Sequence, residues 1–197
     1  MSWKIYLIVI TNSINTQLSE IPKMIGLNNL TSKKEVTMME AQYKEKGVSI
    51  GKYEDKIFIV SQQLVFDLLE KDNSDLKQKL IKSFPNSEIA ILTLGYGVHG
   101  YSIIQDKKVI RTKVGFDLKS SIDFGDKLSE EIEAYNEISN DKELIAEIKE
   151  ESPDDLQSII NENTGEDTVF RLTKRYFKER IDKDGSDFDK ITLLYYE

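Results

Sequence analysis

The 197-residue sequence contains no cysteine and only one histidine, His99. The absence of cysteine excludes disulfide bonds, a thiol nucleophile, iron–sulfur clusters and every zinc site that uses cysteine. A single histidine excludes any site that needs two. The sequence also lacks the GxSxG, SxxK and GxxxxGK[ST] motifs, which disfavours the hydrolases and P-loop nucleotide-binding proteins that are built on them.

Long apolar runs are absent as well. The longest run near the start is Ile5 to Ile10, and its six residues are too few for a signal-peptide core or for a membrane span of about 20 residues. With no export signal and no disulfides, we expect a soluble cytoplasmic protein that does not associate with a membrane.

The composition is that of a folded protein. Hydrophobic residues make up 39% of the chain and charged residues 31%, which is enough to bury a core. The sequence shows no internal repeat and no linker rich in proline or serine, so a two-domain interpretation lacks a hinge. We therefore predict one domain over residues 1–197.

Charge is distributed unevenly along the chain. The formal net charge of −8 disfavours a general nucleic-acid or anionic-membrane binder, since phosphate neutralisation needs clustered lysine and arginine. Residues 1–125 carry a net charge of +3, residues 126–167 carry −12 and residues 168–197 carry +1. The acidity therefore belongs to one segment of 42 residues.

The hydrophobic pattern predicts an α+β fold, with a mixed but largely antiparallel sheet and helices packed on it. Residues 2–10 read as a central strand, because they are almost continuously apolar after Lys4. Residues 126–180 are predicted to be mainly helical, in two or more helices with a new one after Gly165, and residues 188–196 to form a strand that returns to the sheet. The segment 33–43 is ambiguous. The other predicted strands are 48–51, 56–60, 88–94, 101–104 and 109–113, and the other predicted helices cover 16–25, 61–69 and 74–84.

A literal GxGxxG motif runs from Gly95 to Gly100, with Asp117 standing 22 residues after the first glycine. Dinucleotide binding requires a helix that begins at these glycines and holds the pyrophosphate at its N-terminus. The residues that follow form a hairpin pattern instead, so a glycine-rich turn between strands is the favoured interpretation.

The segment from Asp182 to Asp187 is similar to the start of a calcium loop. An EF-hand loop needs glycine at its sixth position and glutamate at its twelfth, and these positions hold Asp187 and Leu193. An acidic surface turn is the favoured interpretation, and we predict neither a metal nor a cofactor.

Two further features admit two interpretations each. His99 has the ordinary pKa of a general base, but a lone histidine in a turn is more often a polar surface or capping residue, which we favour. A basic helix face could bind an anion, or form ion pairs with the acidic segment before it, which we also favour. The face consists of Arg171, Lys174, Arg175 and Lys178.

The second half of the chain resembles a loosely defined group of uncharacterised bacterial α+β domains. The resemblance rests on His99, on a hairpin that ends at Ile110 and Arg111, and on the segment Gly125–Glu131, which has Lys127 and Ser129 where the group has prolines. A helix that ends at Tyr176 and Phe177, an acidic turn over 182–189 and a final strand complete it. It implies no established activity, and it makes His99, Arg111 and Glu131 the positions to test for a ligand site.

Three functional hypotheses follow. The leading one is a non-catalytic module, such as an immunity or antitoxin protein, that binds a basic protein through the acidic segment 126–167. The alternative is a small-molecule sensor or enzyme with a site around His99, in which Arg111 anchors an anion. A structural or dimerising module is the third. We expect no catalytic residues under the leading hypothesis and no nucleic-acid partner.

Overall fold

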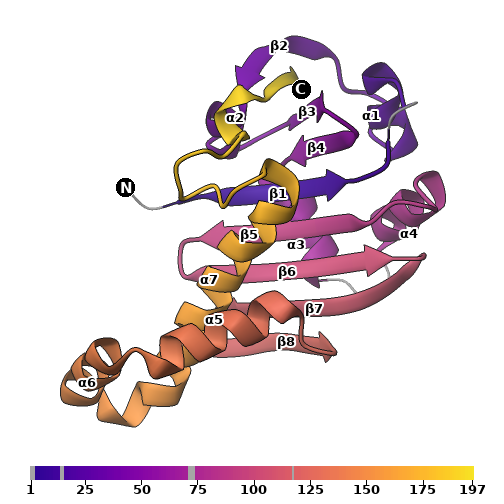
Figure 1. Cartoon of the computed structure of the whole chain (residues 1–197). Helices are drawn as coiled ribbons and strands as arrows, with labels where there is room; N and C mark the ends of the chain where they lie inside the picture. The colour runs from indigo at the N-terminus through magenta and orange to yellow at the C-terminus, as the bar shows by residue number, and fades with distance from the viewer. Residues whose placement is uncertain (1–2, 14–15, 71–73, 117) are drawn as a thin grey trace.

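The protein is built on one nine-stranded sheet (Figure 1). The structure is a computed structural model that describes residues 3–13, 16–70, 74–116 and 118–197. Along the sheet the strands follow the order β2-β9-β3-β4-β1-β5-β6-β7-β8. The strands are β1 (Ile5–Ile10), β2 (Ser32–Thr37), β3 (Val48–Tyr53), β4 (Lys56–Val60), β5 (Ile89–Gly95), β6 (Val98–Gln105), β7 (Lys108–Phe116), β8 (Lys119–Gly125) and β9 (Thr192–Tyr196).

The sheet is antiparallel at every pairing among these strands, which corrects the prediction of a mixed sheet. Four of the eight pairings, β3–β4, β5–β6, β6–β7 and β7–β8, are short hairpins, and such connections can only produce antiparallel pairs. The C-terminal strand β9 inserts between β2 and β3 and runs antiparallel to both. Residues 188–190 form a 3-10 turn, so the returning strand is shorter than the predicted 188–196.

Helices cover both faces of the sheet. The α-helices are α1 (Ile21–Met24), α2 (Met38–Gln42), α3 (Gln62–Glu70), α4 (Asp75–Ser83), α5 (Ser129–Asn140), α6 (Lys142–Glu151) and α7 (Leu156–Phe177). The ambiguous segment 33–43 is resolved as β2 followed by α2, whose N-terminus is capped by Thr37 and Glu40. Among the residues that the structure describes, no helix has the length and apolar character needed to cross a membrane.

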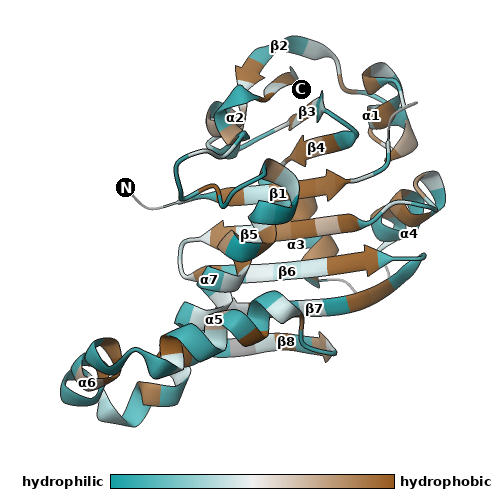
Figure 2. Ribbon diagram, viewed as in Figure 1, coloured by the Kyte–Doolittle hydropathy of each residue, from teal (hydrophilic) through white to brown (hydrophobic). Residues whose placement is uncertain are grey.

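Two hydrophobic cores lie on opposite faces of the sheet, because alternate residues of a strand point to opposite sides. In the central strand β1, Ile5, Leu7 and Val9 face the core under α2 and α7, whereas Tyr6 and Ile8 face the core under α1, α3 and α4. All six residues of β1 are buried, which confirms the predicted central strand, and the central strands are the most hydrophobic part of the ribbon in Figure 2.

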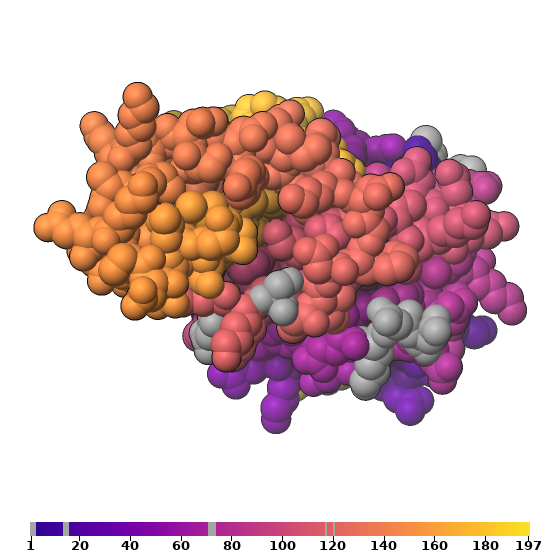
Figure 3. All heavy atoms as spheres, turned by 90° about the horizontal axis from the view of Figure 1, so that it is seen from below, coloured from indigo at the N-terminus to yellow at the C-terminus, as the bar shows by residue number. Residues whose placement is uncertain are grey.

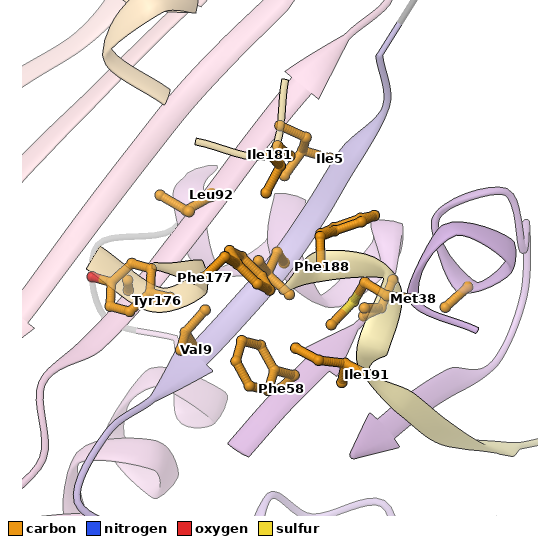
Figure 4. Packing of buried hydrophobic residues seen from close by; sticks show 14 of the residues in the cluster. Ile5, Val9, Met38, Phe58, Leu92, Tyr176, Phe177, Ile181, Phe188 and Ile191 are labelled. Atoms are coloured by element: carbon orange, nitrogen blue, oxygen red, sulfur yellow. The ribbon is translucent and has the colours of Figure 1, made fainter. Parts of the chain in front are cut away.

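The core beneath α7 is centred on aromatic rings (Figure 4). Phe177 at the end of α7 lies with its ring centroid 5.1 Å from that of Phe58 on β4 and 5.4 Å from that of Phe188. These contacts tie the C-terminal segment to the centre of the sheet. One sheet with a core on each face makes the protein a single α+β domain.

Candidate functional site

The candidate residues lie where α5 and α7 pack over strands β6, β7 and β8. His99, Tyr101 and Ile103 of β6 pair with Gly115, Lys113 and Arg111 of β7, respectively. In an antiparallel sheet, paired residues point to the same face. His99, Lys113 and Arg111 therefore all face the helices α5 and α7.

Arg111 is bound on all sides by the protein itself. Its Nε and Nη2 donate to Glu131 Oε1 and Oε2 at 2.7 and 2.8 Å, and its Nη1 donates to Asp123 Oδ1 at 2.5 Å. The same Nη1 reaches the carbonyl oxygens of Phe124 and Gly125 at 2.9 and 3.1 Å. The guanidinium therefore joins β7, β8 and α5, and it offers little to an outside anion.

Glu131 completes this buried pair. Its side chain is 2% exposed and that of Arg111 is 1% exposed. Glu131 Oε1 also accepts the backbone N–H of Leu128 at 3.1 Å, at the start of α5. Burial acts to lower the pKa of Arg111, but the hydrogen bonds that Arg111 donates to Glu131 and Asp123 outweigh burial and raise it.

His99 is a buried residue of β6 and not the turn or surface residue that the sequence suggested, since it is only 5% exposed. Its ring lies between Gly115 of β7 and Gly165 of α7, and a Cβ at either glycine would collide with the ring. The Nδ1 atom is buried and has no hydrogen-bond partner among the described residues. Burial, and then the charge of Lys113, lowers the pKa of His99 from 6.5 to about 4.

The predicted start of a new helix after Gly165 is wrong. Helix α7 is continuous from Leu156 to Phe177, and Gly165 lies within it as a buried residue. Glycine costs a helix about 1 kcal/mol relative to alanine, and here it allows the helix to approach the imidazole of His99. The periodicity of α7 contains no sign of this approach, because the reason for the glycine lies on another strand.

We expect Gly165→Ala to destabilise the protein by about 1–3 kcal/mol, since overpacking at the imidazole outweighs the better helix propensity of alanine. Urea unfolding of the variant measures this loss. In the double variant with His99→Ala the collision is removed, so the combined loss should be smaller than the sum of the two single losses. Additive losses would contradict the packing of His99 against Gly165.

A small cavity opens beside His99, between the ends of β6, β7 and β8 and the first half of α7. Its volume is about 150 Å³. Arg111 and Glu131 do not line it, and Arg111 lies about 13 Å along the sheet from His99, at a register offset of four residues. The lining residues are His99, Lys113, Gly115, Leu118, Lys119, Asp123, Lys127, Asn161 and Glu162.

Sequence reasoning missed Lys113 and the strand β8. Lys113 lies in an alternating strand pattern that does not reveal whether its lysine faces solvent or a helix. Strand β8 is at the edge of the sheet and has few apolar residues, which is typical of edge strands and weakens the strand signal.

The other motifs act in the fold. Tyr96 and Gly97 form the tight turn between β5 and β6, both with positive φ, so the GxGxxG sequence is a hairpin turn and no helix begins there. Asp117 lies outside the described residues. In the acidic turn, Asp187 is 2% exposed and pairs with Lys178 at 2.6 Å, so this turn is not entirely at the surface. The described residues hold no cluster of carboxylates and histidine that is suited to a metal ion.

The acidic segment is divided between paired and unpaired carboxylates. Those of α5 that face α7 are neutralised: Arg175 pairs with Glu130 at 2.5 Å, and Arg171 pairs with Glu133 and Glu137. The other cations of the basic face pair too, Lys174 with Glu179 and Lys178 with Glu54 and Asp187. The predicted pairing with the acidic segment is confirmed for Arg171 and Arg175, whereas Lys174 and Lys178 pair with carboxylates outside that segment.

The unpaired carboxylates gather further along the chain, in a segment that we call the acidic lobe, residues 141–155. It consists of α6 with its capping residue Asp141 and the 3-10 turn Pro153–Asp155. Seven acidic and two basic residues give it a formal charge of −5. Figures 1 and 3 show the lobe at one end of the molecule, beyond the strands of the sheet. Within the lobe, Asp141 caps α6, and the other six acidic residues are exposed and form no ion pair with the described residues: Glu143, Glu147, Glu150, Glu151, Asp154 and Asp155.

Comparisons with known proteins add no relative to this description. No family model, no curated protein and no solved structure matches the chain.

Proposed function

We propose that the protein is a non-catalytic protein-binding module that uses the acidic lobe to bind a basic protein. The observation that carries this proposal is the division of the carboxylates. Those that face α7 are neutralised by arginine, whereas six carboxylates of the lobe are exposed to solvent and pair with no cation of the described residues. A concentrated charge of this kind attracts a basic partner and accelerates its association.

Exposed apolar side chains on α5 also support a protein-binding surface next to the acidic lobe. Ile132 and Tyr135, one helical turn apart, are 50% and 39% exposed. Tyrosine is enriched at the centre of protein interfaces, where a rim of charged residues often surrounds it. The helix α5 leads directly into α6, so an apolar contact and a charged one are available on consecutive elements.

The lobe contributes little to the sheet that carries it. Helix α6 contacts α5, α7 and the turn that follows it, and it covers no strand. A projecting element that is not needed to bury the sheet suits recognition of a partner. An immunity or antitoxin role in the cytoplasm, without a nucleic-acid partner, is the form of this function that we propose.

The test changes the charge of the lobe without changing its shape. The variant Glu143→Gln/Glu147→Gln/Glu150→Gln/Glu151→Gln should weaken binding of the basic partner by about tenfold or more at low salt, and raising the salt should reduce the difference. The partner is recovered on the immobilised chain, purified and titrated by calorimetry, and only the titration counts as support.

The matched control removes four charges elsewhere, with Glu20→Gln/Glu35→Gln/Glu45→Gln/Glu70→Gln, all at exposed positions. This control should bind the partner about as well as the unchanged protein. Equal affinity of the lobe variant and the control variant would refute the proposal, as would the failure of any basic protein to bind the unchanged chain.

A further inference from the structure

The cavity beside His99 has the features of a ligand-binding site, and it is separate from the acidic lobe. Its walls come from three strands and a helix that are distant in sequence: His99 of β6, Lys113 of β7, Asp123 of β8 and Asn161 of α7. Lys127, in the segment between β8 and α5, also lines it. Such convergence of polar side chains on a concave surface is typical of ligand sites.

His99 forms a buried polar wall of this cavity. It is 5% exposed, and its Nδ1 is buried without a partner among the described residues. A buried polar atom without a hydrogen bond destabilises the folded state, so most such atoms in proteins are paired. A neutral imidazole offers one donor and one acceptor, and the low pKa of His99, about 4, keeps the ring neutral near pH 7.

Lys113 is the cation of this cavity. Its side chain is half-buried and forms no hydrogen bond or ion pair with the residues that the structure describes, and burial lowers its pKa despite the nearby Glu131 and Asp123. Both of these carboxylates are already bound by Arg111. A half-buried ammonium group without a counterion is unfavourable, and an anion in the cavity would relieve it.

Further lysines surround the opening. Lys119 and Lys127 are exposed and line the cavity with Lys113, so three cations face two carboxylates, Asp123 and Glu162. Since Asp123 accepts a hydrogen bond from Arg111 at 2.5 Å, its negative charge is partly neutralised. The balance of charge at the opening favours an anion.

From this geometry we propose that the cavity between β6–β8 and α7 binds a small organic or inorganic anion, with Lys113 as its main counterion and His99 and Asn161 as hydrogen-bonding partners. Lys119 and Lys127 attract the anion to the opening. The buried pair Arg111–Glu131 acts as a positioning element, since Arg111 joins β7 to α5 through Glu131 and to β8 through Asp123.

The size of the cavity limits the ligand. A volume of about 150 Å³ is comparable to that of an engineered protein cavity that holds benzene. It is smaller than the cavities of about 300–1,000 Å³ that hold drug-sized molecules. The ligand is therefore a short carboxylate or a phosphate, and a nucleotide is too large to be enclosed.

The single histidine provides a direct measure of occupancy. The ¹³Cε1–¹H signal of selectively labelled His99 is followed by NMR while acetate, succinate or inorganic phosphate is titrated at constant ionic strength and pH. We expect a saturable shift with at least one of these anions and none with the neutral succinamide. Saturation with the carboxylates alone identifies an organic acid as the ligand class, and saturation with phosphate alone identifies a phosphate.

Substitutions of the lysines test whether they bind the anion. Lys113→Met keeps the aliphatic stem of the side chain and should lower the affinity for the anion that saturates the signal about tenfold or more. Lys127→Met, at an exposed position, should lower that affinity several-fold. The matched control, Lys82→Met, removes an exposed charge from α4 on the opposite face of the sheet and should leave binding unchanged. The proposal is overturned if no anion shifts the His99 signal saturably, if succinamide binds as well as succinate, or if both lysine variants bind like the control.

Discussion

Glu131→Gln should lower the free energy of unfolding by about 3–5 kcal/mol, the usual cost of removing one partner of a buried ion pair. The cost arises because Arg111, which is 1% exposed, keeps its charge and loses its bidentate partner. Arg111→Met should destabilise the protein by a similar amount, since Glu131 is then left buried without a cation. Urea denaturation at neutral pH measures both losses.

The control for this prediction lies on the same helix. Glu137 of α5 pairs with Arg171, but its side chain is 74% exposed, so Glu137→Gln should cost only about 0–1 kcal/mol. The double variant Arg111→Met/Glu131→Leu leaves no buried charge from the pair, and its loss should be well below the sum of the single losses. The prediction is wrong if Glu131→Gln costs no more than Glu137→Gln.

Acidification should destabilise the protein through His99, in a pH window set by its two pKa values. The folded protein holds His99 neutral down to about pH 4, whereas the unfolded chain protonates it near pH 6.5. Between these values the unfolded state binds more protons, so stability falls as the pH falls. A shift of this size corresponds to about 3 kcal/mol, which is fully present above pH 6.5 and lost by pH 4.

The comparison with His99→Gln isolates this effect. Free energies of unfolding are measured from pH 7.5 to 4 for both proteins, and the difference between them should shrink or reverse as the pH falls. Glu166, whose pKa burial raises, acts in the opposite direction at the lower end of the window, and it is common to both proteins. An NMR titration of the ring should place the folded pKa near 4. Parallel stability curves would contradict the prediction.

The buried carboxylate Asp187 stabilises the protein too, but it titrates at a pH below this window. The hydrogen bonds from Lys178 and Lys190 lower the pKa of Asp187 to about 2 from an ordinary value of 3.8. Its contribution is therefore present above about pH 3.8 and lost as the pH falls toward 2. Asp187 therefore does not affect the window between pH 6.5 and 4.5, and the difference between the two proteins in that window reports on His99.

Much of the fold follows from local patterns. The continuous apolar run of β1 requires a strand that is covered on both faces, and the hairpins predicted at 48–60 and 101–113 appear as β3–β4 and β6–β7. The helix predicted at 74–84 appears as α4, and Ser74 caps its N-terminus. These features are local, so the residues that form them contain the whole signal.

The candidate site was only partly predictable, because it depends on contacts between elements that are distant in the sequence. His99, Arg111 and Glu131 were named, but the partner of each lies on another element: Gly165 of α7 packs on His99, and Glu131 of α5 binds Arg111. Lys113 was missed because a lysine in a strand becomes a cavity cation only when a helix covers that face of the sheet. Periodicity within one segment cannot report on such neighbours.

The sequence by itself determined an α+β domain with a central apolar strand, a local excess of acid and no cysteine or histidine-pair chemistry, because these depend on composition and short-range pattern. Tertiary structure alone decided which carboxylates are neutralised and which are not. It also decided that the lone histidine is buried beside a cavity rather than exposed in a turn. Burial and charge pairing depend on distances across the sheet, and those distances arise only when α5 and α7 pack on β6–β8.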